Sequence, residues 1–393
     1  MLHSPISRSD DLSRLRDEGY EVDIQSNYLV IRNVPYVNHQ CQIKRGLLAS
    51  PLDLNDDVTV RPTDHQAYFS GEYPCDNNGQ FLEKIVIDNA STVMGDGLII
   101  NYCFSSKPRG GYQDYYHKMI TYINILSGYA RKIDPKVTAK TSVLIESKDS
   151  NSVFEYMDSA SSRAGISAAS AKLESEKIAI VGLGGTGSYV LDLIAKTPVK
   201  EIHLFDDDDF LQHNAFRTPG AASKEELRAR HKKVKYLSER YGSMRRGIEE
   251  HAVHIDADNV SLLKGMTFVF ICIDNGAAKL PIIEYLENEG ISFIDVGIGI
   301  YFKKQDAKIG GHIRVTTSTD KMRECARRHI DFSEGGPDNV YEQNVQVAEL
   351  NALNANLAVI KWKKLLGFYF DFDNEHNSTY TIDGNSLTNE RHA

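Results

Sequence analysis

The chain has 393 residues, of which 41% are hydrophobic and 25% charged, and its formal net charge at neutral pH is −9. Since a typical domain has about 150 residues, this length predicts at least two domains with buried cores. The acidic balance opposes non-specific binding to nucleic-acid phosphates, and MTFVFICI at 266–273, the longest apolar run near the middle, is too short to span a bilayer. We therefore expect neither a membrane nor a nucleic acid as the main partner.

Two further features of the composition restrict the class of protein. The N-terminus lacks the basic and then apolar layout of a secretion signal, so we expect a cytoplasmic protein. The five cysteines are odd in number, widely scattered and never arranged as CxxC. This pattern argues against a disulfide framework and a four-thiolate zinc site, and we expect no zinc.

The first part of the chain predicts a small α+β domain over residues 1–145. Amphipathic spacing predicts a helix at 112–133. Stretches rich in residues that favour β-structure predict strands at 28–37, 57–64 and 96–107. We expect this domain to recruit a substrate or a partner. Residues 146–176, which are rich in Ser, Ala and acidic side chains, predict a linker with a helix that leads into the next strand.

From Lys177 onward, strand patterns alternate with helix patterns. Apolar runs predict strands at 177–183, 199–206, 268–274 and 292–300, and the stretches between them predict helices at 187–197, 223–241 and 277–290. A return strand at 310–319 and one long helix at 345–370 follow. This alternation predicts an α/β domain over 177–393, with a Rossmann-like, mostly parallel sheet and helices on both faces.

A glycine-rich turn joins the first strand of this domain to its helix. Gly182, Gly184 and Gly187 satisfy GxGxxG, and such glycines let the backbone approach phosphates, whose charge the helix N–H groups stabilise. Asp206, about twenty residues further on, has the place of the acid that holds ribose hydroxyls in dinucleotide enzymes. The motif alone leaves a redox dinucleotide and a cleaved triphosphate open.

The residues after the second strand favour the triphosphate. Residues 205–217, FDDDDFLQHNAFR, place Asp206 and Asp208 at DxD spacing and Asn214 three residues before Arg217. Transfer of a nucleotidyl group shifts negative charge onto the departing pyrophosphate, so an arginine and a lysine that reach the phosphates lower the barrier. Arg217 and one lysine of HKKVK at 231–235 are suitably placed.

Taken in order, GLGGTGS, DDDDF, HNAFR, the lysine helix and ICIDN resemble the ThiF/MoeB-like superfamily of ubiquitin-activating-type adenylyltransferases, over roughly residues 155–370. The resemblance implies ATP and Mg²⁺ as cofactors and a substrate carboxylate that attacks the α-phosphate. It implies phosphate contacts by Gly182, Gly184, Gly185, Gly187, Asn214 and Arg217. It also implies that Asp206 holds the ribose with Asp208 as a helper, that Lys233 contacts the transferring group, and that Asp274 holds Mg²⁺ or orients ATP.

Some positions stay open or depart from the family. Lys232 and Lys235 are alternatives to Lys233, and Lys279 stands where the family commonly has an arginine. Lysine keeps the charge but not the planar fork. Arg163 is a candidate to reach the ATP of a neighbouring subunit.

The resemblance also implies partners. The usual substrate is the C-terminal glycine of a ubiquitin-like protein, so we expect such a partner in a bacterial conjugation system, a homodimer, and a conjugating enzyme as a further candidate. Cys325 is the candidate for a thioester, because Arg323, Arg327, Arg328 and His329 would favour its thiolate. Two alternatives are adenylation of a peptide or RNA-linked carboxylate, and a non-catalytic nucleotide-binding scaffold.

Overall fold

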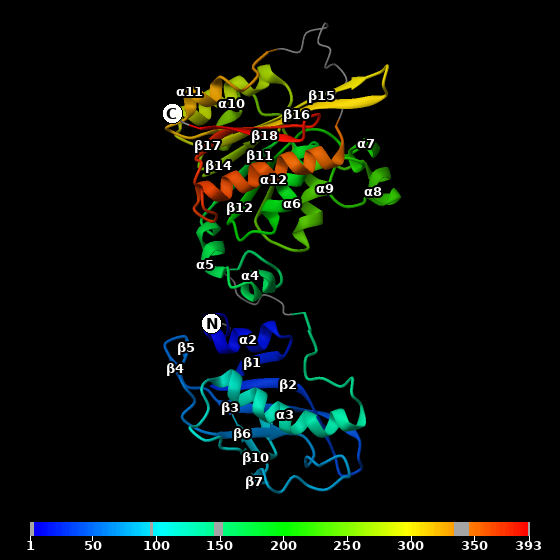
Figure 1. Cartoon of the computed structure of the whole chain (residues 1–393), viewed down its shortest axis with the longest axis vertical. Coiled ribbons are helices and arrows are strands. Elements are labelled where there is room, and N and C mark those ends of the chain that lie inside the picture. Colours follow the sequence, from blue (N-terminus) through cyan, green and yellow to red (C-terminus); the bar gives the residue numbers. More distant parts are fainter. Residues whose placement is uncertain (1–3, 95–96, 145–151, 334–345, 392–393) are drawn as a thin grey trace. The chain divides into compact units, whose positions relative to one another are not determined.

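The computed structural model describes residues 4–94, 97–144, 152–333 and 346–391 (Figure 1). The chain divides into two compact units, Met1–Ser150 with Met157–Gly165, and Asn151–Tyr156 with Ile166–Ala393. The first part of the predicted linker, residues 146–151, lies outside the described residues, as do residues 96 and 345 at the ends of two predicted elements. Within the described ranges, no helix combines the length and the apolar character needed to cross a membrane.

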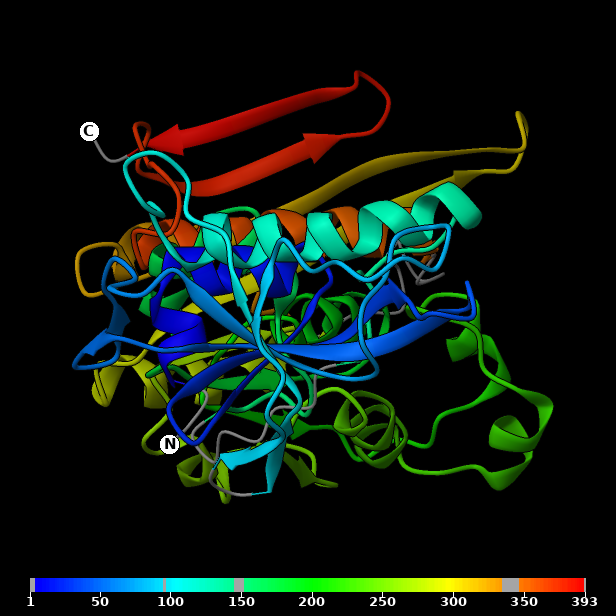
Figure 2. The same ribbon diagram turned by 90° about the horizontal axis from the view of Figure 1, so that it is seen from below.

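The N-terminal unit is built on a six-stranded antiparallel sheet. Its strand order is β1-β2-β3-β6-β10-β7, with the bounds β1 Glu21–Gln25, β2 Tyr28–Val37, β3 Ile43–Pro51, β6 Gln66–Ser70, β10 Tyr102–Ser105 and β7 Val86–Asp88. Helix α3 (Tyr115–Ile133) packs along one face of this sheet (Figure 2). The Asp114 carboxylate caps the start of α3 by accepting a hydrogen bond from the His117 N–H at 2.6 Å. Helices α1 (Ser4–Arg8), α2 (Asp10–Asp17) and α4 (Ser159–Arg163) also belong to this unit.

Two of the strands predicted in this unit differ from the observed ones. At 57–64 only β5 (Val58–Thr59) is a strand, paired with β4 (Leu54–Asn55), and Pro62, which has no N–H, cannot extend the ladder. The stretch at 96–107 forms two strands, β10 and β9 (Leu98–Ile100), and β9 pairs with β8 (Thr92–Met94).

The C-terminal unit contains an eight-stranded sheet with the order β13-β12-β11-β14-β15-β16-β17-β18. The strands from β13 to β15 pair in parallel, and the last three pairings are antiparallel. Their bounds are β13 Ile248–His251, β12 Glu201–Phe205, β11 Lys177–Val181, β14 Phe268–Ile271, β15 Ser292–Lys303, β16 Lys308–Ser318, β17 Glu375–Thr381 and β18 Ser386–Arg391. The predicted fold class, a Rossmann-like α/β sheet beside a smaller α+β domain, is confirmed.

Helices cover both faces of this sheet. One face packs against α6 Gly185–Ala195, α9 Lys233–Gly242 and α12 Ala348–Leu365, and the other against α10 Gly276–Asn288 and α11 Arg323–Arg327 (Figure 1). Strand β11 is buried on both sides, since Ile178 and Ile180 enter one core while Ala179 and Val181 enter the other. The remaining helical segments of this unit are α5 Ser167–Ser170, η1 Ala171–Leu173, α7 Gln212–Ala215, α8 Lys224–Ala229 and η2 Val260–Leu263.

The structure corrects the prediction in this unit at two places. The charged stretch 223–241 is two helices, because Arg230 adopts a left-handed conformation with φ 49° between α8 and α9. The hairpin β17–β18 at the edge of the sheet was not predicted (Figure 2). Its strands, EHNSTYT and SLTNER, are largely polar and lack the apolar alternation that marks a half-buried strand.

Candidate active site

A cavity of about 280 Å³ lies beside the carboxyl ends of the parallel strands. The Gly182–Gly185 turn follows β11, Asp206 follows β12 and Asp274 follows β14. Residues that follow three different strands therefore line the same cavity. In open α/β sheets, ligands bind outside this edge. The side chains that reach the cavity therefore form one candidate site.

Close contacts exclude a side chain at three of the four glycines of the turn, and the fourth faces open space. Gly182 has φ 89°, and a Cβ there would lie 2.8 Å from the Cys272 carbonyl oxygen. At Gly187 a Cβ would lie 1.9 Å from the Gly182 carbonyl oxygen, so this glycine allows α6 to approach the strand. Gly185 would meet the side chain of Asn351 on α12 at 2.1 Å. Gly184 alone has nothing within 4 Å of the added atom, which leaves open space where the turn faces the cavity.

A buried lysine and two aspartates form the polar side of the cavity. Lys233 Nζ lies 2.6 Å from Asp208 Oδ2 and 3.2 Å from Asp206 Oδ1. Asp206 also accepts the Leu183 N–H at 2.7 Å and thereby orders the glycine turn. The hydrogen bond from Lys233 lowers the pKa of the Asp208 carboxyl below its ordinary value. These contacts hold the three charged side chains beside the glycine turn.

The structure distinguishes the three candidate lysines. Lys233 is the first residue of α9, is 5% exposed and lines the cavity. Lys232 instead donates to the Asp207 carbonyl at 2.7 Å and pairs with Asp209. Lys235 lies at the surface, 3.8 Å from Glu239. Only Lys233 among these three reaches the cavity.

Two buried donors in or just after α7 lack a partner within the part of the chain that the structure describes. They are the Asn214 Nδ2 amide and the Arg217 Nε. Asn214 belongs to α7, where its oxygen accepts the Leu211 N–H at 2.8 Å, and Arg217 lines the cavity. Buried donors without acceptors are costly, by about 1–3 kcal/mol each. An anionic ligand with several acceptor oxygens, such as a polyphosphate, fits this deficit.

The cavity wall contains charged residues that the sequence did not reveal as a group. Asp295, which is fully buried, pairs with Lys279 at 2.7 Å and with Arg314 at 2.6 Å, and both cations line the cavity. Asp295 interrupts an apolar strand, and this interruption is the signal that could have marked it. Asp274 also lines the cavity, and its carboxylate oxygens are of the kind that Mg²⁺ prefers.

Four predicted site residues, Gly187, Asn214, Arg163 and Cys325, do not line this cavity. Arg163 is exposed at the end of α4, which belongs to the first compact unit. Cys325 lies in α11 and lines a different cavity. Arg323 and Arg327 pair with Asp320 and Glu287 rather than with this thiol, and Arg328 Nη2 approaches the sulfur at 3.5 Å.

Family comparisons match the two parts of the chain separately. Residues 10–159 match a domain of unknown function (DUF6791), and residues 157–393 match the ThiF family. The second match covers more than half of the chain and confirms the resemblance inferred from the motifs.

Individual relatives share part of the chain. A tRNA threonylcarbamoyladenosine dehydratase of Haemophilus influenzae is 30% identical over 134 residues, which are 32% of this chain and 49% of that protein. The chain thus spans about half the length of this curated relative. Solved structures that resemble this chain include E. coli MccB, with TM-score 0.44 and 17% identity over 57% of this chain and 64% of MccB. PaaA has TM-score 0.43 and 16% identity over 57% of this chain and 75% of PaaA.

Proposed function

Because the chain belongs to the ThiF family, we propose that its C-terminal unit uses ATP to adenylate a carboxylate. The observation that carries the proposal is the unpartnered buried donor Arg217 Nε, which belongs to a residue that lines the cavity beside the glycine turn. A second such donor, Asn214 Nδ2, lies three residues earlier in the chain, in a residue that does not line the cavity. A polyphosphate supplies the acceptors that the described residues do not. A nucleotide-binding scaffold without catalysis would not need the additional cation Lys233 beside them.

The cavity residues take complementary roles in this proposal. The N–H groups of the Gly182–Gly187 turn hold phosphates at the start of α6, where the helix dipole favours negative charge. Asp206 holds the ribose, with Asp208 beside it. Lys233 and Arg217 compensate the charge that develops on the phosphates. Asp274 would hold Mg²⁺, which neutralises charge on the polyphosphate.

The chemical step needs no general base. A carboxylate is ionised at neutral pH, since its ordinary pKa lies near 4. One of its oxygens forms a bond to the α-phosphorus, the bond from that phosphorus to the bridging oxygen breaks, and pyrophosphate leaves with the electron pair. The product is an acyl-adenylate, and positioning together with charge compensation provides the rate.

For the carboxylate we propose the C-terminus of a ubiquitin-like protein. An extended chain terminus is thin enough to bring its carboxylate to a cavity of about 280 Å³, while the rest of such a protein stays outside. We propose that the enzyme acts as a homodimer, in which Arg163 contacts the ATP bound by the other subunit. We also propose that Cys325 is the thiol that forms a thioester after adenylation. A conjugating enzyme would then receive the activated protein.

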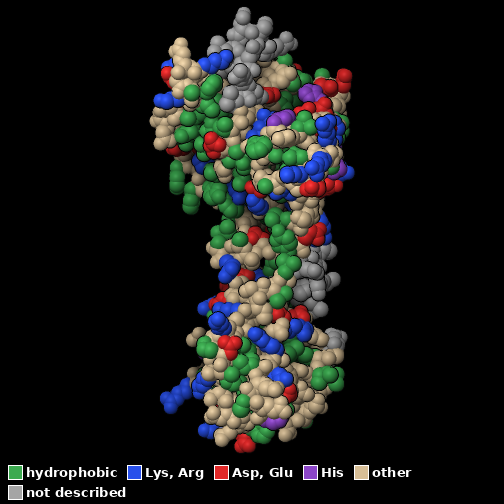
Figure 3. All heavy atoms as spheres, turned by 90° about the vertical axis from the view of Figure 1, so that its right-hand side faces the viewer, with side chains coloured by type: hydrophobic (Ala, Val, Ile, Leu, Met, Phe, Trp, Pro, Cys, Tyr) green, Lys and Arg blue, Asp and Glu red, His purple; other side chains and the backbone are tan. Residues whose placement is uncertain are grey.

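One observation favours a second candidate, a carboxylate attached to RNA. The Haemophilus influenzae relative is named for a tRNA nucleoside. The net charge of −9 opposes it. On the face drawn in Figure 3, basic side chains lie among acidic ones rather than in a broad basic surface.

Pyrophosphate exchange into ATP tests the proposal and separates the two substrates. We expect exchange that depends on a small protein ending in glycine and that is lost in Asp274→Asn. Asp258→Asn, which changes an exposed aspartate outside the cavity, is the control and should retain exchange. Exchange supported only by tRNA would select the second candidate, and binding of ATP without exchange under any condition would contradict adenylation.

A further inference from the structure

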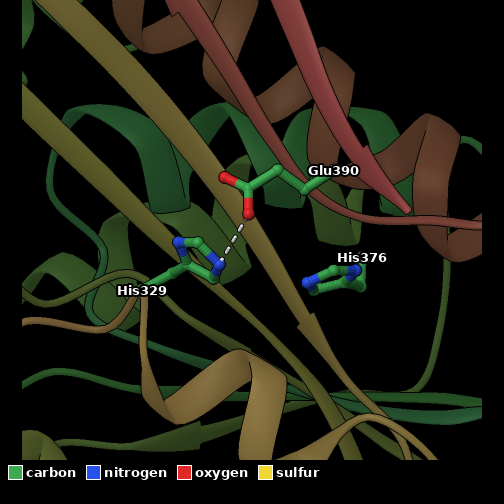
Figure 4. A group of neighbouring side chains, drawn as sticks. All are labelled: His329, His376 and Glu390. Carbon is green, nitrogen blue, oxygen red and sulfur yellow. Dashed lines mark ion pairs between the residues drawn. The ribbon is translucent and has the colours of Figure 1, made fainter. Parts of the chain in front are cut away.

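Three side chains of metal-ligand type converge where α11 meets the hairpin β17–β18 (Figure 4). His329 follows α11, His376 belongs to β17 and Glu390 belongs to β18. One ligand atom from each lies within 4.8 Å of the other two, and His329 Nε2 is 3.0 Å from Glu390 Oε2. In a tetrahedral zinc site, bonds of about 2.0–2.1 Å separate neighbouring ligand atoms by about 3.3 Å. Small side-chain movements would bring these atoms to that spacing.

A β-bulge explains why His376 reaches the group. Glu375 pairs with Arg391 and Asn377 with Glu390, so His376 is an extra residue without an opposite number on β18. In a regular strand, the neighbour of Asn377 would point away from the face that Asn377 and Glu390 share. A bulge turns such a side chain, and bulges are frequent beside functional sites. His376, only 6% exposed, is thus directed toward Glu390.

A chain of hydrogen bonds orients the carboxylate. Asn377 Nδ2 donates to Glu390 Oε1 at 3.1 Å, which leaves Oε2 facing His329. Asn377 Oδ1 in turn accepts from Thr316 Oγ1 at 2.8 Å. Such outer contacts fix the orientation of metal ligands in known sites. The support comes from two neighbouring strands and is independent of the nucleotide cavity.

From this geometry we propose that His329, His376 and Glu390 bind one zinc-class divalent transition metal ion. Two imidazoles and one carboxylate are an established ligand set for zinc that leaves a fourth position open. The adjoining cavity of about 720 Å³, which these three residues help to line, gives that position room. The proposed site departs from the expectation of no zinc, which rested on the absence of CxxC pairs and so bears only on a four-thiolate site.

The ligand atoms select the class of metal. The carboxylates Asp320 and Glu324 and the cations Lys321, Arg323, Arg328 and Arg391 also line the cavity, and their charges act on every divalent ion alike. Hard ions such as Mg²⁺ and Ca²⁺ depend on several oxygen ligands, whereas the three converging side chains supply one carboxylate. Imidazole nitrogen instead favours zinc, nickel or cobalt. Without a metal, the contact of His329 with Glu390 is an ion pair that joins α11 to the hairpin, and this is the competing interpretation.

The test titrates the full-length protein, first freed of metals by chelation, with Zn²⁺ in a calorimeter and with Co²⁺ under visible absorption. We expect one equivalent to bind, with the cobalt absorption of a low-coordinate site. Glu390→Gln, which changes a half-exposed carboxylate and retains the hydrogen bond from Asn377, should weaken binding at least tenfold, as should His329→Asn. His312→Asn, an exposed histidine on β16, is the matched control and should bind like the wild type.

Three results would overturn the assignment. They are no stoichiometric binding of either metal, equal binding by Glu390→Gln and wild type, or loss of binding in Cys325→Ser, which would move the ion to the thiol four residues before His329. Asp274→Asn should retain zinc binding even though it loses pyrophosphate exchange. A failure of the metal site is therefore distinguishable from a failure of the proposed adenylation.

Discussion

Lys279 and Asp295 form an ion pair, 2.7 Å long, in the wall of the proposed nucleotide cavity, and neither side chain is more than 5% exposed. Arg314 holds the second carboxylate oxygen at 2.6 Å. Asp295 thus compensates two cations at once, and it keeps both beside the place where phosphates are proposed to bind. Its removal would take from two largely buried cations the carboxylate that contacts both of them.

Asp295→Asn is therefore expected to destabilise the protein strongly. Breaking a buried ion pair costs about 3–5 kcal/mol, which urea unfolding followed by tryptophan fluorescence would measure, since the single tryptophan, Trp362, lies in the core of this unit. Asp306→Asn is the control, because its pairing with Lys303 is exposed and such pairs contribute about 0–1 kcal/mol. Equal losses in the two variants would show that the buried pair has no special role.

Neighbouring lysines offer a matched test of catalysis. Lys233→Met should lower kcat/KM for pyrophosphate exchange by about 10²–10³, the range for loss of one group that stabilises transition-state charge. Lys232→Met should stay near the wild-type value, because this lysine pairs at the surface with Asp209. Thermal unfolding of both variants verifies that the fold is retained. The reverse order of effects would assign the phosphate contact to Lys232.

The glycine turn predicts two different outcomes for the same substitution. Gly187→Ala should destabilise the protein by at least 1–3 kcal/mol, the typical range for overpacking, because its Cβ would lie 1.9 Å from a carbonyl oxygen. Gly184→Ala has open space for the methyl group, so we expect unchanged stability but weaker ATP binding, since that space belongs to the cavity. Unfolding midpoints and nucleotide titration would measure the two effects. Wild-type ATP affinity in Gly184→Ala would show that phosphates do not approach this position.

The N-terminal unit predicts a dependence of stability on pH through Lys118. This lysine is fully buried in α3, and desolvation lowers its pKa to about 8. In the unfolded chain its pKa is near 10.4, so between these values the unfolded state binds more protons. The free energy of unfolding should rise with pH across this window, by up to about 3 kcal/mol from this group.

Comparison with Lys118→Met isolates this contribution. Burial raises the pKa of Tyr122 nearby, which makes stability fall at high pH in both proteins alike. Burial also raises the pKa of Cys103, but the charge of Lys118 lowers it, so both proteins carry Cys103→Ser in this comparison. The difference in unfolding free energy between wild type and variant should therefore increase from about pH 8 to pH 10 in the wild type's favour. A constant difference would mean that Lys118 titrates normally in the folded protein.

Local patterns along the chain were enough to predict the α/β class and the strand–glycine–helix unit at 177–197. They succeed there because apolar periodicity and turn chemistry act between residues that are close in sequence. Prediction failed where one residue breaks a continuous pattern. In the charged stretch 223–241, the chain turns at Arg230 although this residue is neither a glycine nor a proline. The next helix, α9, starts at Lys233. That start decides which lysine faces the cavity.

Only the tertiary structure brings together residues from distant strands. Asp295 and Arg314 share a face because β15 and β16 pair with Asp295 opposite Thr316. His329, His376 and Glu390 meet because a bulge in β17 turns one side chain toward the next strand. Strand register and bulges are set by pairing between segments far apart in sequence, so no local pattern specifies them. The sequence alone therefore determined the fold class and the glycine turn, and long-range pairing decided which charged side chains lie beside that turn.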